Sequence, residues 1–261
     1  MKKKYEHIKS NIIQHSLIIT LNRPNKRNAL NPKMINEIQE VFDINKKNNN
    51  IRVILIESSS NVFCAGADIE YLNKIKEFSY EDNLMDSKTL MKLFKTMLSY
   101  PKLIISKVCG AAMGGGCGIV TASDIIFATH NSKFGYPEVK IGFTPALVST
   151  FLIQKINLSN TQELLLSGKI IDGEKAKKIG LVNFLFSEKD IHKEILQFID
   201  DFTAETSSDS IQTTKEILYS HLEIDKKLEQ AAKFNADSRK NADFKKGITA
   251  FLNKKKINWS K

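Results

Sequence analysis

Two runs of apolar, largely β-branched residues most constrain the fold of this chain, because each is followed by a loop of small residues and then by a helix. The runs lie at 51–56 and 103–108. The apolar residues of 51–56 do not alternate with polar ones and are interrupted only by Arg52, so they predict a strand buried on both faces, as in a parallel sheet; 103–108 is expected to be the next strand. Further strands are expected at 12–21 and 125–128. This alternation of strands and helices predicts an α/β core.

Helical spacing of apolar residues dominates the second half of the chain. In the first half, Asn31 and Pro32 supply an N-cap and a first-turn proline for a helix. Further helices are expected at 80–99, 147–155, 160–166, 173–178, 188–204, 208–221 and 223–252. The length of 261 residues suits one substantial core with an appendage. We therefore expect residues 1–200 to form the α/β core and residues 201–261 to form a helical region.

Composition argues against several classes of protein. A hydrophobic content of 42% and five prolines indicate an ordered chain. No run approaches the roughly 18 apolar residues that cross a bilayer, so no membrane contact is expected. Polar residues at 6, 7, 9, 11, 14 and 15 interrupt any apolar export signal, so a cytoplasmic location is expected. Cys64, Cys109 and Cys117 have no CxxC spacing, which argues against a metal site or a disulfide scaffold.

The chain is basic, with 39 Lys and Arg against 29 Asp and Glu and a net charge of +10. Positive residues concentrate at 26–27, 245–246 and 254–256. Such a surface suits nucleic acid, phospholipid or a phosphorylated small ligand, although a lysine-rich composition alone also produces it. No nucleic-acid module or stripe of stacking aromatic residues is apparent, so a nucleic-acid partner is not favoured.

Two loops and one carboxylate are the candidate functional residues. The first loop, 63–68, follows the strand at 51–57, and the second, 110–118, follows the strand at 103–108. Small residues let the backbone approach a ligand closely, and free N–H groups at helix starts favour negative charge. Two such groups aimed at one oxygen would form an oxyanion hole, while Glu138 would move a proton. Tight turning alone would explain either loop, but the combination suggests enolate chemistry.

Taken together, these segments resemble the enoyl-CoA hydratase/isomerase (crotonase) superfamily over nearly the whole chain. The matching segments lie at 22–31, 63–69, 110–117, 124–128, 134–139, 141–145, 173–176 and 179–183. The resemblance implies a crotonase-like spiral of ββα turns with a C-terminal helical trimerisation region, assembled as a homotrimer or a dimer of trimers. It also implies an acyl-CoA thioester substrate, with no cofactor beyond the coenzyme A moiety of that substrate.

The resemblance further implies roles for individual residues. The backbone N–H groups of Ala67 and Gly115 should hold the thioester oxygen, and Glu138 should be the acid or base. Positions that contact coenzyme A in the family are matched by Lys26, Ala29, Ala65, Asp68 and Ile69. The acyl pocket is expected to include Gly114, Gly118, Pro137 and Phe143. Residues 250–254 resemble a segment that often reaches the coenzyme A of a neighbouring subunit.

Gly118 departs from the family pattern. Two-carboxylate hydratases have a glutamate there that helps to position and activate water, whereas here Glu138 is the only carboxylate retained. Its neighbours are expected to desolvate it and raise its pKa toward neutrality; they are Phe134, Tyr136, Val139 and Phe143. We hypothesise that the missing side chain at position 118 makes room for a branched or carboxylated acyl group.

Two reactions are compatible with this arrangement of residues. A single carboxylate suffices to shuttle one proton in Δ3–Δ2 double-bond isomerisation, so the chemistry alone favours an isomerase. The runs 116–118 and 138–146, however, resemble short- or branched-chain enoyl-CoA hydratases, including methylglutaconyl-type ones. Hydration is therefore placed first and isomerisation second. Decarboxylation, thioester hydrolysis, a catalytically silent acyl-CoA-binding subunit and RNA binding are minor alternatives.

Overall fold

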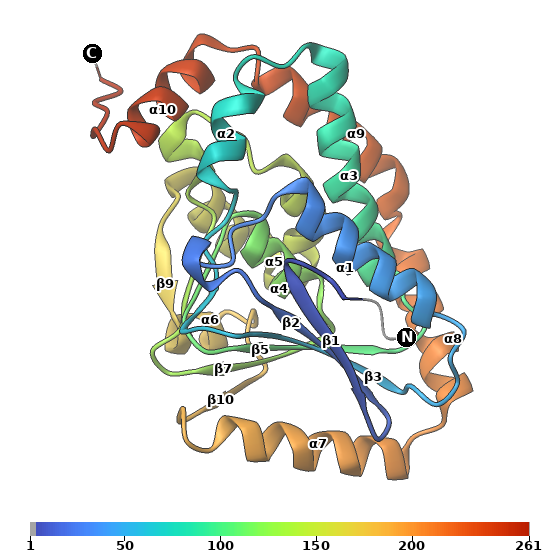
Figure 1. The fold of residues 1–261 in the computed structure, drawn as a ribbon. Helices are drawn as coiled ribbons and strands as arrows, with labels where there is room; N and C mark the ends of the chain where they lie inside the picture. Colours follow the sequence, from blue (N-terminus) through green and yellow to red (C-terminus); the bar gives the residue numbers. More distant parts are fainter. Residues whose placement is uncertain (1–3, 261) are drawn as a thin grey trace.

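The strands form two sheets in the computed structural model, which describes residues 4–260 (Figure 1). The larger sheet has the order β1-β2-β3-β5-β7-β10, and the smaller has the order β4-β6-β8-β9. β1 pairs antiparallel with β2 and β9 pairs antiparallel with β8, while the other pairings are parallel. The strands are β1 (Ile8–Ile13), β2 (Ser16–Leu21), β3 (Val53–Ser58), β4 (Val62–Cys64), β5 (Leu103–Val108), β6 (Ala111–Met113), β7 (Ile125–Thr129), β8 (Lys133–Gly135), β9 (Ile170–Asp172) and β10 (Phe184–Phe186).

Successive pairs of strands divide between the two sheets and are followed by helices. β3 and β4 precede α2 and α3, β5 and β6 precede α4, and β7 and β8 precede η2 and α5. The helices are η1 (Pro24–Lys26), α1 (Pro32–Asn45), α2 (Ile69–Ile75), α3 (Tyr80–Leu98), α4 (Gly115–Ala122), η2 (Pro137–Ile141), α5 (Ala146–Ser167), α6 (Gly173–Lys178), α7 (Ile191–Glu205), α8 (Ser208–Leu222), α9 (Ile224–Ser238) and α10 (Ala242–Leu252). The expected α/β spiral of ββα turns is thereby confirmed.

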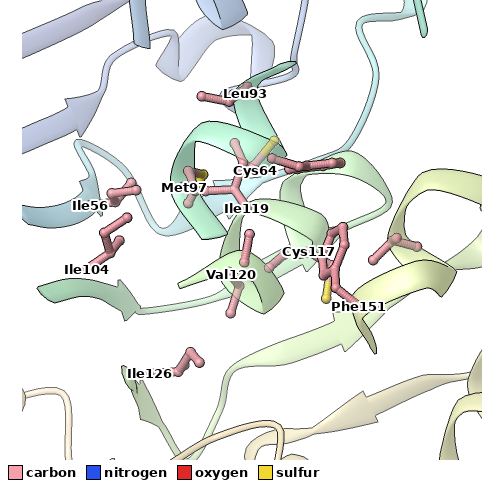
Figure 2. Packing of buried hydrophobic residues seen from close by; sticks show 14 of the residues in the cluster. Ile56, Cys64, Leu93, Met97, Ile104, Cys117, Ile119, Val120, Ile126 and Phe151 are labelled. Carbon is pink, nitrogen blue, oxygen red and sulfur yellow. The ribbon is translucent and has the colours of Figure 1, made fainter. Parts of the chain in front are cut away.

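The large sheet is covered on both faces, which explains its continuous apolar strands. Helix α7 lies along one face, where Ile195 packs in a cluster with Val53 and Ile105 (Figure 1). Helices α1, α3 and α4 belong to the main core on the other face. Figure 2 shows Ile119 and Val120 of α4 between α3 and the strands of the large sheet. Helix α4, whose first residue is Gly115, is therefore held inside the core.

Local backbone geometry changes three of the expected elements. The strand expected at 12–21 is a hairpin of β1 and β2, which turns at Gln14 with φ 49°. The helices expected at 147–155 and 160–166 are one element, α5, interrupted by the non-helical Asn157. The helix expected at 223–252 is divided into α9 and α10. α10 approaches η2 so closely that a Cβ on Gly247 would lie 2.1 Å from the Ile141 carbonyl oxygen.

The C-terminal helices share their core with the spiral. The expected boundary at residue 200 falls inside α7. Helix α9 lies beside α3 and α5, and its residues Leu228, Ala231 and Ala232 belong to the main hydrophobic cluster (Figure 1). Residues 201–261 are thus not a separately packed unit within the described part of the chain. Their role in oligomerisation stays a prediction.

The cysteines and acidic residues form no metal-holding group of three or more within residues 4–260. All three cysteines are free thiols, and burial raises the pKa of Cys64 and Cys117 to about 12. These two thiols are therefore neutral near pH 7. Over the same residues, no helix is both long enough and apolar enough to span a bilayer.

Lys155 of α5 provides a test of how α4 is held. Its Nζ donates to the carbonyl oxygens of Thr121 (3.1 Å) and Ser123 at the C-terminal end of α4. Lys155→Met would leave these carbonyls without their donor, so we expect it to destabilise the fold by about 1–3 kcal/mol. Urea unfolding measures this change. The exposed Lys178→Met is the matched control, and an equal loss in both variants would contradict the assignment.

Candidate active site

A cavity of about 390 Å³ lies between the two predicted loops, η2 and the helices α2, α3 and α9. Seven of the predicted site residues line it: Ala65, Ala67, Gly114, Gly115, Pro137, Glu138 and Phe143. Its wall is mainly apolar, with residues such as Leu72, Leu90 and Phe94. The spiral therefore brings both loops and the predicted acid to one place, although the loops are far apart in sequence.

Two backbone N–H groups in the cavity wall are free to bind a ligand. The Leu30 N–H donates to the Gly66 carbonyl (2.7 Å) and the Asp68 N–H donates to the Leu30 carbonyl (2.8 Å), so Ala67 is held from both sides. Gly115 is the first residue of α4, where an N–H has no acceptor within the helix. Within residues 4–260, neither the Ala67 nor the Gly115 N–H donates to a backbone carbonyl. This arrangement suits a negatively charged oxygen.

An ion pair behind the first loop holds Ala67 in place. Asp68 is buried and accepts hydrogen bonds from Arg23 Nη2 (2.8 Å), the Glu70 N–H (2.8 Å) and the Tyr71 N–H (3.3 Å). Burial acts to raise the pKa of Asp68, but these hydrogen bonds and the Arg23 charge lower it overall. The carboxylate therefore caps α2 and fixes the end of the loop. Arg23 was not identified as a site residue from the sequence.

Four of the predicted coenzyme A contacts surround this loop without lining the cavity. Lys26 pairs with Glu70 at the surface, Ala29 is buried, and Ile69 is 55% exposed at the start of α2. Asp68 is occupied by Arg23. Ala65 is the one member of the predicted set that reaches the cavity wall. Contact of these residues with coenzyme A stays a prediction.

Glu138 lies on η2 with its carboxyl group directed to the second loop. A Cβ on Gly114 would be 3.1 Å from Glu138 Oε1, so the glycine lets the carboxyl group approach the backbone. Oε2 is inaccessible to solvent and has no hydrogen-bond partner within the described residues. Burial raises the pKa of Glu138 to about 7. Near neutral pH both protonation states are therefore populated, which suits a general acid or base.

The expectation that Gly118 opens space for the acyl group is wrong in this structure. Gly118 is buried but does not line the cavity, and a Cβ on it would lie 2.6 Å from Phe94 Cζ. The Phe94 ring is itself buried against Phe151, with ring centroids 5.2 Å apart. The position that carries a carboxylate in two-carboxylate hydratases is thus closed by an aromatic ring. Phe94 lies within the helix expected at 80–99, but the sequence gives no sign of this contact.

Sequence reasoning also missed a polar cluster in the cavity wall. Tyr71 and Asp86 come from α2 and α3, Arg239 directly follows α9, and all three line the cavity. Arg239 lay in what was expected to be one long helix, where no motif marked it. The pairing of these residues depends on packing between helices that are far apart in the chain.

The contact between Gly118 and Phe94 can be tested by a double-mutant cycle. Gly118→Ala should destabilise the fold by about 1–3 kcal/mol through overpacking, despite the gain in helix propensity of roughly 1 kcal/mol. In a Phe94→Leu background the same change should cost less than about 1 kcal/mol. Urea unfolding of the four proteins gives the coupling energy. An equal cost in both backgrounds would mean that Phe94 is not the obstacle.

Comparison with known proteins gives a matching family and individual sequence relatives. The family model for enoyl-CoA hydratase/isomerase matches residues 9–261. A Thermus thermophilus protein named "Putative enoyl-CoA hydratase" is 32% identical over 243 residues, covering 92% of this chain and 96% of that protein. The Escherichia coli K12 protein named 2,3-dehydroadipyl-CoA hydratase is 30% identical over 245 residues, covering 93% and 94%.

The fold has close counterparts among solved structures. A crystal structure of an enoyl-CoA hydratase/isomerase from Xanthobacter autotrophicus Py2 aligns with a TM-score of 0.88, covering 96% of this chain and 94% of that one. At 23% identity this likeness establishes the shared fold. The family model and the two sequence relatives extend the likeness to the sequence itself. The chain belongs to the enoyl-CoA hydratase/isomerase family.

Proposed function

We propose that this protein hydrates the double bond of a short or branched 2-enoyl-CoA thioester. The observation that carries the proposal is the buried Glu138 carboxyl group, whose Oε2 has no hydrogen-bond partner among the described residues and which shares one cavity with the free N–H groups of Ala67 and Gly115. The sequence relatives named above carry hydratase names, which supports hydration as the reaction type. A methylglutaconyl-type substrate is the branched form of the same proposal.

The two N–H groups act on the thioester carbonyl. When a nucleophile adds to Cβ, negative charge moves to the carbonyl oxygen and an enolate forms. The Ala67 and Gly115 N–H groups, one of them at the start of α4, stabilise this charge without reorganising. Each donor contributes roughly 3 kcal/mol in comparable oxyanion holes. The loop fixed by Leu30 and Asp68 thus has a direct catalytic use.

Glu138 completes the addition of water. In its protonated form, one oxygen gives its proton to Cα while the other accepts a proton from the water that adds to Cβ. Water is consumed, one C–O and one C–H bond form, and the carboxyl group ends in the protonation state in which it began. One carboxyl group therefore suffices for syn addition, provided that it is protonated when substrate binds.

Isomerisation of a 3-enoyl-CoA is the second candidate, and Phe94 favours it. The aromatic ring beside Gly118 removes a polar position at which a second carboxylate would orient water. An ionised Glu138 would take a proton from Cα and return it to Cγ, with the dienolate held by the same N–H groups. The two candidates thus require opposite protonation states of one residue.

Substitution of Glu138 tests its role in either reaction. Glu138→Gln retains the shape of the side chain but cannot exchange the proton, so we expect turnover of crotonyl-CoA or 3-hexenoyl-CoA to fall by about 10²–10⁴-fold. Loss of the enoyl-thioester absorbance follows hydration, and its appearance follows isomerisation. Glu163→Gln, an exposed glutamate paired with Lys169 and Lys175, is the control. Unchanged turnover in Glu138→Gln would contradict a catalytic role of Glu138, whereas no turnover of either substrate by the unmodified protein would favour a catalytically silent subunit.

The pH dependence of kcat/KM separates the two reactions. Because the pKa of Glu138 is raised to about 7, its protonated form disappears above that pH. Hydration by the protonated acid should therefore be constant at low pH and fall as pH rises through about 7. Isomerisation by the ionised base should rise through the same region and then level off. A profile that does not bend near this pKa would contradict the assignment of Glu138 to either role.

A further inference from the structure

A buried charged cluster lies in the cavity wall, on different elements from Glu138. Arg239 Nη1 donates to Asp86 Oδ2 (2.6 Å) and to Asn83 Oδ1 (3.1 Å). The Tyr71 hydroxyl donates to the other oxygen of Asp86 (2.5 Å). The Arg239 side chain is only 6% exposed, although its residue lines the cavity. Both oxygens of Asp86 are therefore occupied by protein donors.

Arg239 retains donors that the protein does not use. A guanidinium group has five N–H donors, of which two are on Nη1. Within the described residues, Nε is buried without a hydrogen-bond partner and Nη2 makes no hydrogen bond. Nε and Nη2 form one edge of the planar group, which is suited to a carboxylate that accepts two parallel hydrogen bonds. A buried, unused edge of this kind in a cavity wall indicates a missing acceptor.

Phe143 connects this cluster to the reacting end of the cavity. The Cζ atom of Arg239 lies 5.1 Å from the centroid of the Phe143 ring. The Phe143 N–H donates to the backbone carbonyl oxygen of Glu138 (3.0 Å), so Phe143 contacts both the Arg239 side chain and the backbone that carries Glu138. An acyl chain with its thioester near Glu138 would pass the Phe143 ring before it reaches Arg239. Because Nε is inaccessible to solvent, a carboxylate reaches Nε as well as Nη2 only when the groups that cover Nε move.

The charges in the wall favour an anion. The charged side chains among the lining residues are Asp86, Glu138, Lys140 and Arg239. Asp86 offsets Arg239, and Glu138 is neutral when protonated, so Lys140 leaves a net charge of +1. Burial, together with the neighbouring Asp86, raises the pKa of Tyr71, so its hydroxyl remains a donor to Asp86. The cluster thus presents unused guanidinium donors to the cavity, and Lys140 adds a positive charge to the same wall.

We propose that Arg239, held by Asp86 and Tyr71, binds a carboxylate at the far end of the acyl chain, so that the preferred substrate is the enoyl-CoA of a dicarboxylic acid. This inference rests on the proposed acyl-CoA function, because the thioester end must be bound at Ala67, Gly115 and Glu138. Arg239 touches the substrate but not the reacting carbons. It determines which acyl chain is accepted.

A pair of matched substrates tests the inference on the unmodified protein. 2-Hexenoyl-CoA and 2-hexenedioyl-CoA have the same chain length and differ in a terminal methyl or carboxylate group. We expect kcat/KM to favour the dicarboxylic substrate by about tenfold or more, since a site built for a polar group rejects an analogue that lacks it. Equal values, or a preference for the methyl-ended substrate, would overturn the proposal.

Variants of Arg239 test whether the cluster causes the preference for the dicarboxylic substrate. Arg239→Gln should lower the ratio of the two kcat/KM values by about tenfold, mainly through KM of the dicarboxylic substrate. Lys240→Gln removes an exposed positive charge next in sequence, paired with Asp237, and should leave the ratio unchanged. If Arg239→Gln fails to fold because Asp86 is left unpaired, the variant Arg239→Gln/Asp86→Asn removes both charges together and gives the same test. An unchanged ratio in a folded variant would exclude Arg239.

Binding without turnover distinguishes failure of this inference from failure of the proposed function. If neither substrate is turned over, calorimetry with the saturated hexanoyl-CoA and adipyl-CoA still reports on Arg239. Tighter binding of adipyl-CoA, lost in Arg239→Gln, would support the carboxylate site even if the reaction proposed above is wrong. Equal affinity for the two thioesters would overturn the inference irrespective of activity.

Discussion

The close approach of two successive turns of the spiral is the constraint on which the site depends. A Cβ on Gly116 would lie 2.5 Å from both Cβ and Sγ of Cys64, and a Cβ on Gly66 would lie 3.3 Å from the Met113 carbonyl oxygen. β4 and β6 can therefore pair in parallel with α4 packed directly against the first loop. This contact brings the Ala67 and Gly115 N–H groups to one cavity. Larger side chains at positions 66 and 116 would separate the two donors.

A buried acid follows from the same packing. Glu138 reaches the second loop because Gly114 has no side chain, and the apolar wall then removes water from its carboxyl group. An unpaired buried carboxyl group destabilises a fold unless it is neutral, and a pKa of about 7 is the result of that penalty. The raised pKa of Glu138 is thus a consequence of its poor solvation. Phe94 extends the apolar wall to the position at which related hydratases carry a second acid.

The sequence predicted those parts of the structure that depend on short-range pattern. β5 lies at Leu103–Val108, where the sequence predicts a strand, and the Asn31 side chain caps α1 by accepting from the Met34 N–H. Glu138 and the two loops were identifiable because they belong to motifs with a known order. The contacts of Gly118 with Phe94 and of Asp86 with Arg239 join residues far apart in the chain, the latter 153 positions apart. No local pattern specifies such pairs, since they are set by how α3 packs against α4 and α9.

The cavity separates reaction from recognition. At one end, under the proposed function, backbone donors and a single carboxyl group act on the thioester and its neighbouring carbons, and these groups are the same for any acyl chain. At the other end, Arg239 would meet only a chain of suitable length with a polar terminus. Binding energy gained far from the reacting carbons is useful when it holds the chain in a reactive position. With one acid and no second carboxylate to orient water, this site depends on such positioning more than a two-acid site does. If Arg239 binds the substrate as proposed, anchoring at the far end of the chain would compensate for the carboxylate that is missing at position 118.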